Sequence, residues 1–122
     1  MPFGFLQSDW DSAKEEALAI LSARAANKSL SNRLITYGEL ASAISSIRFF
    51  PDSNVFHKFL GEISSDEDAK GRGMLSAIVV RQSDSFPGSG FFNFAKSMGK
   101  SFHDEIGFWN EQLDLVHKSW SS

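Results

Sequence analysis

The stretch from Leu34 to Phe92 most constrains how this chain of 122 residues can fold. It opens with the apolar pair Leu34-Ile35, which predicts a very short strand. Thr36 and Glu39 follow with the spacing of a capping box, which predicts that a short helix begins there. The residue before a proline avoids helical geometry, so Pro51 marks the latest end of that helix. Its predicted buried face consists of Leu40, Ala41, Ile44 and Ile47.

A second helix is predicted from about residue 54 to residue 64, with Asp52 or Ser53 as its cap. Its periodicity turns Asn54, His57 and Lys58 outward and the aromatic and aliphatic side chains inward. Two short helices in this order are typical of a helix-turn-helix, in which the second helix reads DNA. The same residues also fit a packing helix with a polar outer face.

The rest of the stretch predicts a strand and a glycine-rich loop. Met74 to Val80 is a continuous apolar run rich in β-branched residues, which is typical of a buried strand. An acidic loop at residues 64–68 would precede it. Lys70 and Arg72, on the flexible backbone of the Lys-Gly-Arg-Gly run, would be free to touch phosphate. Pro87-Gly88 predicts a tight reversal and a small β-hairpin. We therefore expect an α+β, mostly helical fold with a winged helix-turn-helix core over about residues 34–92.

Additional helices flank this core in a single predicted domain, residues 1–122. Apolar residues at three- and four-residue steps predict helices over about residues 10–26 and 102–120, with Ser101 capping the second. Residues 1–9 form an apolar arm that we expect to fold back onto the body. Self-association through this arm, or through the C-terminal helix, is the alternative.

Composition excludes several classes of function. The chain has no Cys, so it has neither disulfides nor thiolate metal sites nor a thiol nucleophile. His57, His103 and His117 lack the spacing of metal ligands, so we predict no metal and no cofactor. No apolar run approaches the roughly 20 residues that span a bilayer, and a cytoplasmic protein with no membrane contact is expected. A formal charge of −3 argues against strong nonspecific binding of nucleic acid.

The central stretch resembles the C-terminal winged-helix domain of O6-alkylguanine-DNA alkyltransferases and alkyltransferase-like proteins. Residues 36–41, Thr-Tyr-Gly-Glu-Leu-Ala, are similar to a Thr-Tyr-Gly-x-(Leu/Ile)-Ala segment of that family. The resemblance implies that Tyr37 helps to turn out a nucleotide and that Lys58 replaces the family's arginine finger. It also places Ser76 where the family has its reactive Cys, so alkyl transfer to this chain is excluded.

The whole chain is more similar to a group of uncharacterised bacterial proteins. The matching segments include Ile-Thr-Tyr-x-Glu-Leu-Ala, Leu-Gly-Glu-Ile-Ser and Gly-Arg-x-x-Leu-Ser-Ala, followed by Pro-Gly-x-Gly-Phe-Phe and a C-terminal Phe-Trp. They correspond here to residues 35–41, 60–64, 71–77, 87–92 and 108–109. This resemblance implies a shared fold and a bacterial origin. It does not imply any activity.

Two hypotheses for function follow. The first is a non-enzymatic domain that binds DNA through Tyr37, Asn54, His57, Lys58, Lys70 and Arg72. The second is an adaptor that binds a protein partner or a second copy through the arm or the C-terminal helix. The second rests on the aromatic surplus, twelve Phe and three Trp, and on residues 101–122, where four acids face one Lys. An enzyme that uses Ser76 or a pair of carboxylates is the weakest interpretation.

Overall fold

A computed structural model describes residues 2–121, and within them the chain is mostly helical with a small sheet. The predicted mostly helical α+β class is therefore confirmed. The elements, in chain order, are η1 (Pro2–Gly4), α1 (Gln7–Ala25), α2 (Leu30–Arg33), β1 (Ile35–Thr36), α3 (Tyr37–Ala43), α4 (Asn54–Ala69), η2 (Leu75–Ile78), β2 (Val79–Val80), α5 (Ser89–Ser97) and α6 (Glu105–Trp120).

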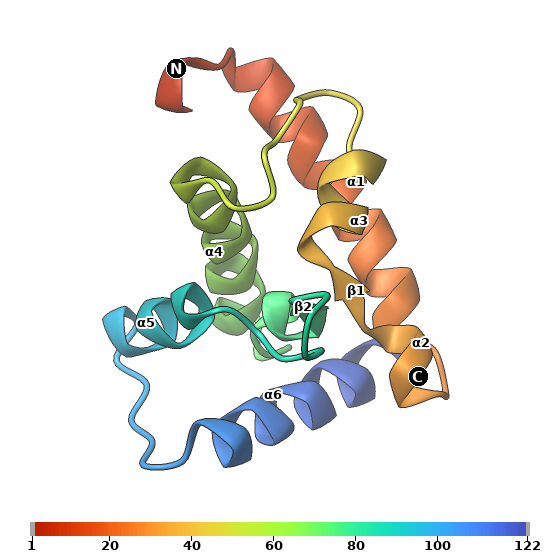
Figure 1. Ribbon diagram of the computed structural model, residues 1–122, viewed down its shortest axis with the longest axis vertical. Coiled ribbons are helices and arrows are strands. Elements are labelled where there is room, and N and C mark those ends of the chain that lie inside the picture. The colour runs from red at the N-terminus through yellow and green to blue at the C-terminus, as the bar shows by residue number, and fades with distance from the viewer. Residues whose placement is uncertain (1, 122) are drawn as a thin grey trace.

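The long helices α1, α4 and α6 surround the short segment η2 (Figure 1). Leu75, Ala77 and Ile78 of η2 are completely or almost completely buried, and all three long helices contact this segment. Helix α5 lies against α4 on the side away from α1 (Figure 1). The hydrophobic core is therefore built around the apolar run that the sequence placed at residues 74–80.

That run is not the continuous strand that we predicted. Residues 75–78 form a 3₁₀ turn, and only Val79–Val80 is a strand. A continuous apolar run has no periodicity that distinguishes a buried strand from a buried helical turn. Helices pack on η2 from three directions, so every one of its side chains is buried whichever way it points.

The predicted β-hairpin is also wrong for the described residues. Strand β1 pairs with β2 in parallel, with Ile35 opposite Val79 and Thr36 opposite Val80. Parallel strands need a crossover, and here α3 and α4 supply it. The reversal at Pro87-Gly88 leads directly into α5 and not into a second strand.

Several helix boundaries in the structure differ from those that we predicted. Helix α4 continues to Ala69, so the predicted acidic loop at residues 64–68 is helical. Helix α3 ends at Ala43, and Ile44 and Ile47 are buried just beyond it. Helix α6 begins at Glu105 with Asp104 as its cap, because the Asp104 carboxylate accepts a hydrogen bond from the Ile106 N–H at 3.1 Å. Ser101 is therefore not the cap.

Residues 2–6 of the predicted arm fold back onto the body, whereas residues 7–9 are the first turn of α1, which begins earlier than predicted. Met1 lies outside the described residues. The rings of Phe3 and Phe5 lie 5.6 Å and 6.2 Å from the ring of Trp10, centroid to centroid. Phe3 and Leu6 nevertheless stay about half exposed, at 50% and 57%. The arm therefore covers the core without being buried itself.

Candidate functional site

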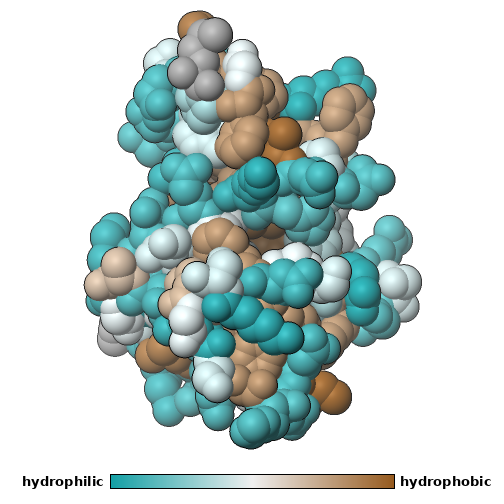
Figure 2. All heavy atoms as spheres, turned by 90° about the vertical axis from the view of Figure 1, so that its left-hand side faces the viewer, coloured by the Kyte–Doolittle hydropathy of each residue, from teal (hydrophilic) through white to brown (hydrophobic). Residues whose placement is uncertain are grey.

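A cleft of about 610 Å³ with a mixed polar and apolar lining opens between the start of α3, the start of α4, the loop after β2 and the start of α5. Its volume lies in the range of small-ligand sites, roughly 300–1,000 Å³. Figure 2 shows the face that carries α4 and α5, where polar and apolar side chains alternate. The side chains that line the cleft with polar atoms are Tyr37, Asp52, Asn54, His57, Arg81, Gln82, Ser89 and Asn93.

Tyr37 enters the cleft because a capping box starts α3 immediately before it. The Glu39 N–H donates to Thr36 Oγ1 at 3.1 Å, and the Thr36 N–H donates to Glu39 Oε1 at 3.0 Å. This confirms the predicted cap and makes Tyr37 the first residue of the helix. Burial raises the pKa of the Tyr37 hydroxyl, so this group is protonated at neutral pH.

His57 forms the wall next to Tyr37. It lies in the first turns of α4, which Ser53 caps by accepting a hydrogen bond from the Phe56 N–H at 3.2 Å. The centroids of the two rings are 5.2 Å apart, with an angle of 54° between their planes. Burial lowers the pKa of His57, and the nearby Asp52 carboxylate opposes this effect. The imidazole is therefore mainly neutral at pH 7.

Two glycines let the backbone of the opposite wall approach these rings. A Cβ at Gly88 would lie 3.4 Å from the Tyr37 hydroxyl oxygen, and one at Gly90 would lie 3.3 Å from Nδ1 of His57. The Gly88 N–H donates a hydrogen bond to the Tyr37 hydroxyl at 3.0 Å. A side chain at either glycine would narrow the cleft from this wall.

Besides the Asp52 carboxylate, five polar side chains of the cleft make no hydrogen bond to the protein within residues 2–121, and four of these five are exposed to solvent. The five are Asn54, His57, Gln82, Ser89 and Asn93. Together they offer amide and hydroxyl groups and an imidazole, each of which both donates and accepts hydrogen bonds. Polar groups that converge on one concave surface without protein partners are what fixes a bound ligand.

Arg81 is held in place at the edge of the cleft by a short closed loop. Its Nε and Nη2 donate to the two carboxylate oxygens of Asp84 at 3.2 Å and 2.7 Å. The loop is closed by backbone hydrogen bonds from Arg81 to Phe86 and from Ser85 to Arg81, both at 2.9 Å. The guanidinium therefore has a defined orientation although it is close to half exposed.

The predicted site residues divide into two groups. Tyr37, Asn54 and His57 meet in the cleft, whereas Lys58, Lys70 and Arg72 do not line it. Lys58 lies over the ring of Phe3, with its Nζ 5.3 Å from the ring centroid. This position places it on the side of the N-terminal arm.

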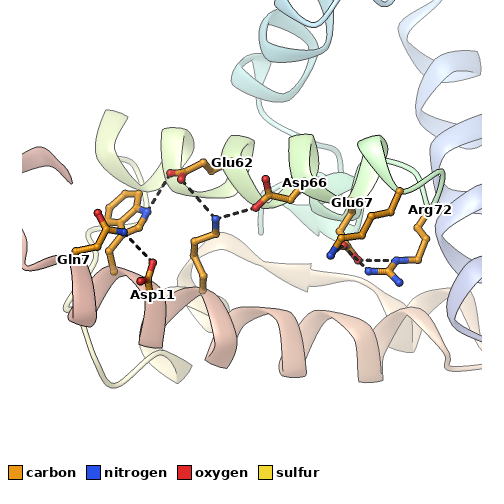
Figure 3. Close-up of polar contacts among 9 residues, drawn as sticks. Gln7, Asp11, Glu62, Asp66, Glu67 and Arg72 are labelled. Atoms are coloured by element: carbon orange, nitrogen blue, oxygen red, sulfur yellow. Dashed lines mark hydrogen bonds and ion pairs between the residues drawn. The ribbon is translucent and has the colours of Figure 1, made fainter. Parts of the chain in front are cut away.

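Lys70 and Arg72 lie at the far end of α4, where both pair with Glu67. Figure 3 shows Glu67 and Arg72 facing each other, and Arg72 donates to both Glu67 oxygens at 3.0 Å and 2.7 Å. Glu67 is only 2% exposed, and the guanidinium also stacks on the Trp120 ring at 4.7 Å. Arg72 therefore neutralises a buried carboxylate and is not the flexible phosphate contact that we predicted.

Sequence reasoning missed Arg81, Gln82, Ser89 and Asn93. They lie in and after a segment that we interpreted only as a turn, where no periodicity distinguishes one side chain from another. The one available signal was the sequence Pro-Gly-Ser-Gly at residues 87–90, which allows a close approach of the backbone.

Ser76, at the position of the family's reactive Cys, is buried behind the cleft at 8% exposure. The Ser64 hydroxyl donates to Ser76 Oγ at 2.6 Å, and the Ser76 N–H donates to Ser64 Oγ at 2.9 Å. These two serines satisfy each other, and neither has a His or carboxylate among its hydrogen-bond partners. Ser76 is a structural residue in this arrangement.

The described residues contain no cluster of three or more His, Asp or Glu side chains suited to a metal ion. Among the three histidines, His117 is engaged through Nδ1 with the Ala25 carbonyl oxygen at 2.8 Å. Among residues 2–121 there is also no helix with the length and apolar character needed to cross a bilayer.

Comparison with protein-family models, curated proteins and solved structures gave no match to this chain. The case for its function therefore rests on the geometry of the cleft.

Proposed function

We propose that this chain is a non-enzymatic DNA-binding domain whose cleft receives one unpaired nucleotide of the strand. The observation that carries the proposal is the meeting of two rings, Tyr37 and His57, with five polar side chains that lack protein partners. Aromatic rings provide stacking surfaces for unpaired bases, and free amide groups hydrogen-bond with base edges. The volume of the cleft suits a ligand of nucleotide size.

The exposed face of α4 supports an unpaired nucleotide over reading of a duplex along the helix. Beyond its first turns this face carries Glu62 and Asp66, which pair with Lys14 of α1 at 3.5 Å and 2.8 Å. Figure 3 shows these two carboxylates in a row along α4. These two carboxylates are engaged with α1, so the free polar side chains Asn54 and His57 in the first turns of α4 are the better candidates for contact with DNA.

The proposal keeps the helix-turn-helix order of α3 and α4. In that motif the N-terminal residues of the second helix reach the bases, and Asn54 and His57 occupy that position here. In a winged helix, the loop before α5 would belong to the same motif as α3 and α4. The long connection at residues 44–53 and the parallel strand pair distinguish this chain from the usual motif.

Fluorescence anisotropy tests the proposal with three labelled oligonucleotides: a single strand, a paired duplex, and the same duplex with one bulged nucleotide. We expect the single strand and the bulged duplex to bind more tightly than the paired duplex. His57→Ala and Asn54→Ala should weaken this binding, while Lys70→Ala, a change of an exposed residue outside the cleft, should not.

Affinity should fall with salt, with a slope set by the number of phosphates contacted. No binding of any oligonucleotide at about 50 µM protein, a concentration that reaches even weak nonspecific binding, would overturn the proposal. Tighter binding of the paired duplex would also overturn it, because the cleft would then not be the contact.

Exposed apolar side chains support a second candidate, a protein-interaction module. Phe50 is 63% exposed, and its neighbour Phe49 packs on Phe5 of the arm at 6.2 Å, where Leu6 is also exposed. Analytical ultracentrifugation of the wild type and of Leu6→Glu tests self-association through this surface. A monomer in both proteins at all concentrations would exclude it.

A further inference from the structure

The cleft carries a single Arg or Lys side chain among the residues that line it, Arg81. The one carboxylate of the lining belongs to Asp52, near His57. All other polar lining groups are neutral at pH 7. Arg81 is therefore the one lining side chain that can attract an anionic group, and its ion pair with Asp84 offsets part of its charge. The other lining groups suit a neutral polar part of the same ligand.

The guanidinium of Arg81 keeps hydrogen-bond donors free for such an anionic group. Asp84 takes the Nε proton and one Nη2 proton, so the Nη1 group and the second Nη2 proton have no protein partner within residues 2–121. The Asp84 carboxylate does not line the cleft, although it orients the guanidinium. Arginine in a fixed orientation binds phosphate through parallel N–H donors better than a flexible lysine does.

Arg81 lines the same cleft as the ring of Tyr37, which would stack on the base. Gln82 follows Arg81 in the chain and lines the same cleft. The cationic position and the stacking and hydrogen-bonding positions are thus neighbours in the cleft, as are the phosphate and the base of one nucleotide.

We propose that Arg81 binds the phosphate of the nucleotide in the cleft, so that the cleft also binds free nucleoside 5′-monophosphates. This inference rests on the proposed function and names the chemical class of its ligand. The base packs against Tyr37 and His57 and is held by the neutral polar groups. The phosphate lies at the cleft edge, where Arg81 supplies the N–H donors that Asp84 leaves free.

Calorimetric titration tests this with four probes: 2′-deoxyadenosine, its 5′-monophosphate, inorganic phosphate and a single-stranded oligonucleotide. Charge-assisted hydrogen bonds should make the monophosphate bind about ten- to hundred-fold more tightly than the nucleoside. Arg81→Ala should abolish this advantage and leave the affinity for the nucleoside unchanged. Arg81→Lys keeps the charge without the planar fork and should retain only part of the advantage.

Arg48→Ala is the matched control, because it removes an exposed arginine that does not line this cleft. Arg48→Ala should leave the ratio of the affinities for the monophosphate and the nucleoside unchanged. A circular dichroism melt of each variant shows whether it is folded, and Arg81→Lys serves as the test if Arg81→Ala does not fold.

Equal affinity for nucleoside and monophosphate in the wild type would overturn the inference, as would an advantage that survives in Arg81→Ala. Inorganic phosphate that binds as tightly as the monophosphate would also overturn it, because an anion site alone would explain the result. Oligonucleotide binding without a phosphate advantage refutes only the role of Arg81. Monophosphate binding without oligonucleotide binding refutes the proposed function and supports the role of Arg81.

Discussion

The hydroxyl of Tyr37 accepts a hydrogen bond from the backbone N–H of Gly88 at 3.0 Å, which ties the start of α3 to the start of α5. This bond closes the cleft on one side. It uses an oxygen lone pair of Tyr37 and leaves the hydroxyl proton free to donate to a ligand.

Tyr37→Phe should therefore destabilise the fold more than it weakens ligand binding. The Gly88 N–H would lose its partner in a half-buried position, at a cost of about 1 kcal/mol. The ring would remain for stacking. Urea unfolding measures the loss of stability, and oligonucleotide titration measures the change in binding. Tyr37→Ala, which removes the ring as well, should weaken binding strongly, and equal binding by both variants would contradict a stacking role for this ring.

Arg72→Ala should be one of the most destabilising single changes in the chain. It would leave the carboxylate of Glu67, only 2% exposed, without its bidentate partner and would remove the stacking on Trp120. The buried carboxylate would keep only the longer ion pair with Lys70, at 3.5 Å, so we expect a clear loss of stability.

Chemical denaturation of Arg72→Ala measures this loss, and Lys70→Ala is its control. Lys70 also pairs with Glu67, at 3.5 Å, but its side chain is exposed, so its removal should cost much less. Nucleotide binding per folded molecule should be unchanged in both variants. Weaker binding by folded Arg72→Ala would return this residue to the candidate site.

Gly61→Ala and Gly38→Ala should change stability in opposite directions. A Cβ at Gly61 would lie 2.7 Å from Cε2 of Phe94, so the Phe94 ring or the two helices would have to shift, at a cost of about 1–3 kcal/mol. At Gly38 the nearest heavy atom would be 4.0 Å away, and alanine should favour α3 by about 0.5–1 kcal/mol. Thermal melts of both variants give the comparison. A neutral Gly61→Ala would contradict the close contact of the two helices.

Local patterns in the sequence located most of α1, α3, α4 and α6, but they did not reveal α2 or the continuation of α4 to Ala69. They also did not reveal which elements pack together. The capping box of Thr36 and Glu39 and the apolar periodicity of α1 and α6 depend on neighbours in the chain, so these elements were predicted nearly where they lie. The direction of strand pairing depends on which distant segment lies beside Ile35, and no local signal carries that information.

The candidate site also depends on contacts between distant segments, which local patterns do not reveal. Tyr37 and His57 were chosen separately, and only the folded chain brings their rings to 5.2 Å. Arg72 stood between glycines and suggested a free cation, because its partner Glu67 was assigned to a solvated loop. Arg81 was overlooked since its position at the cleft depends on the loop that Asp84 closes.

The carboxylate of Glu16 on α1 makes the stability of the fold depend on pH. This carboxylate accepts hydrogen bonds from the backbone N–H groups of Ser45 and Ser46 at 2.8 Å and 3.0 Å, and from both hydroxyls. The hydroxyls of Ser45 and Ser46 are the main cause of a pKa lowered from 4.5 to about 2. The charged form of Glu16 therefore anchors the connection between α3 and α4 to α1.

A lowered pKa in the folded state means that Glu16 binds its proton more readily in the unfolded chain. Its contribution to stability is therefore complete above pH 4.5 and is lost as the pH falls towards about 2. Glu16→Gln should lower the melting temperature at pH 7, and its difference from the wild type should shrink between pH 4.5 and pH 2. Glu15→Gln, an exposed neighbour on α1, controls for the loss of charge. A difference that is constant over this pH range would show that the carboxylate charge of Glu16 does not hold the connection.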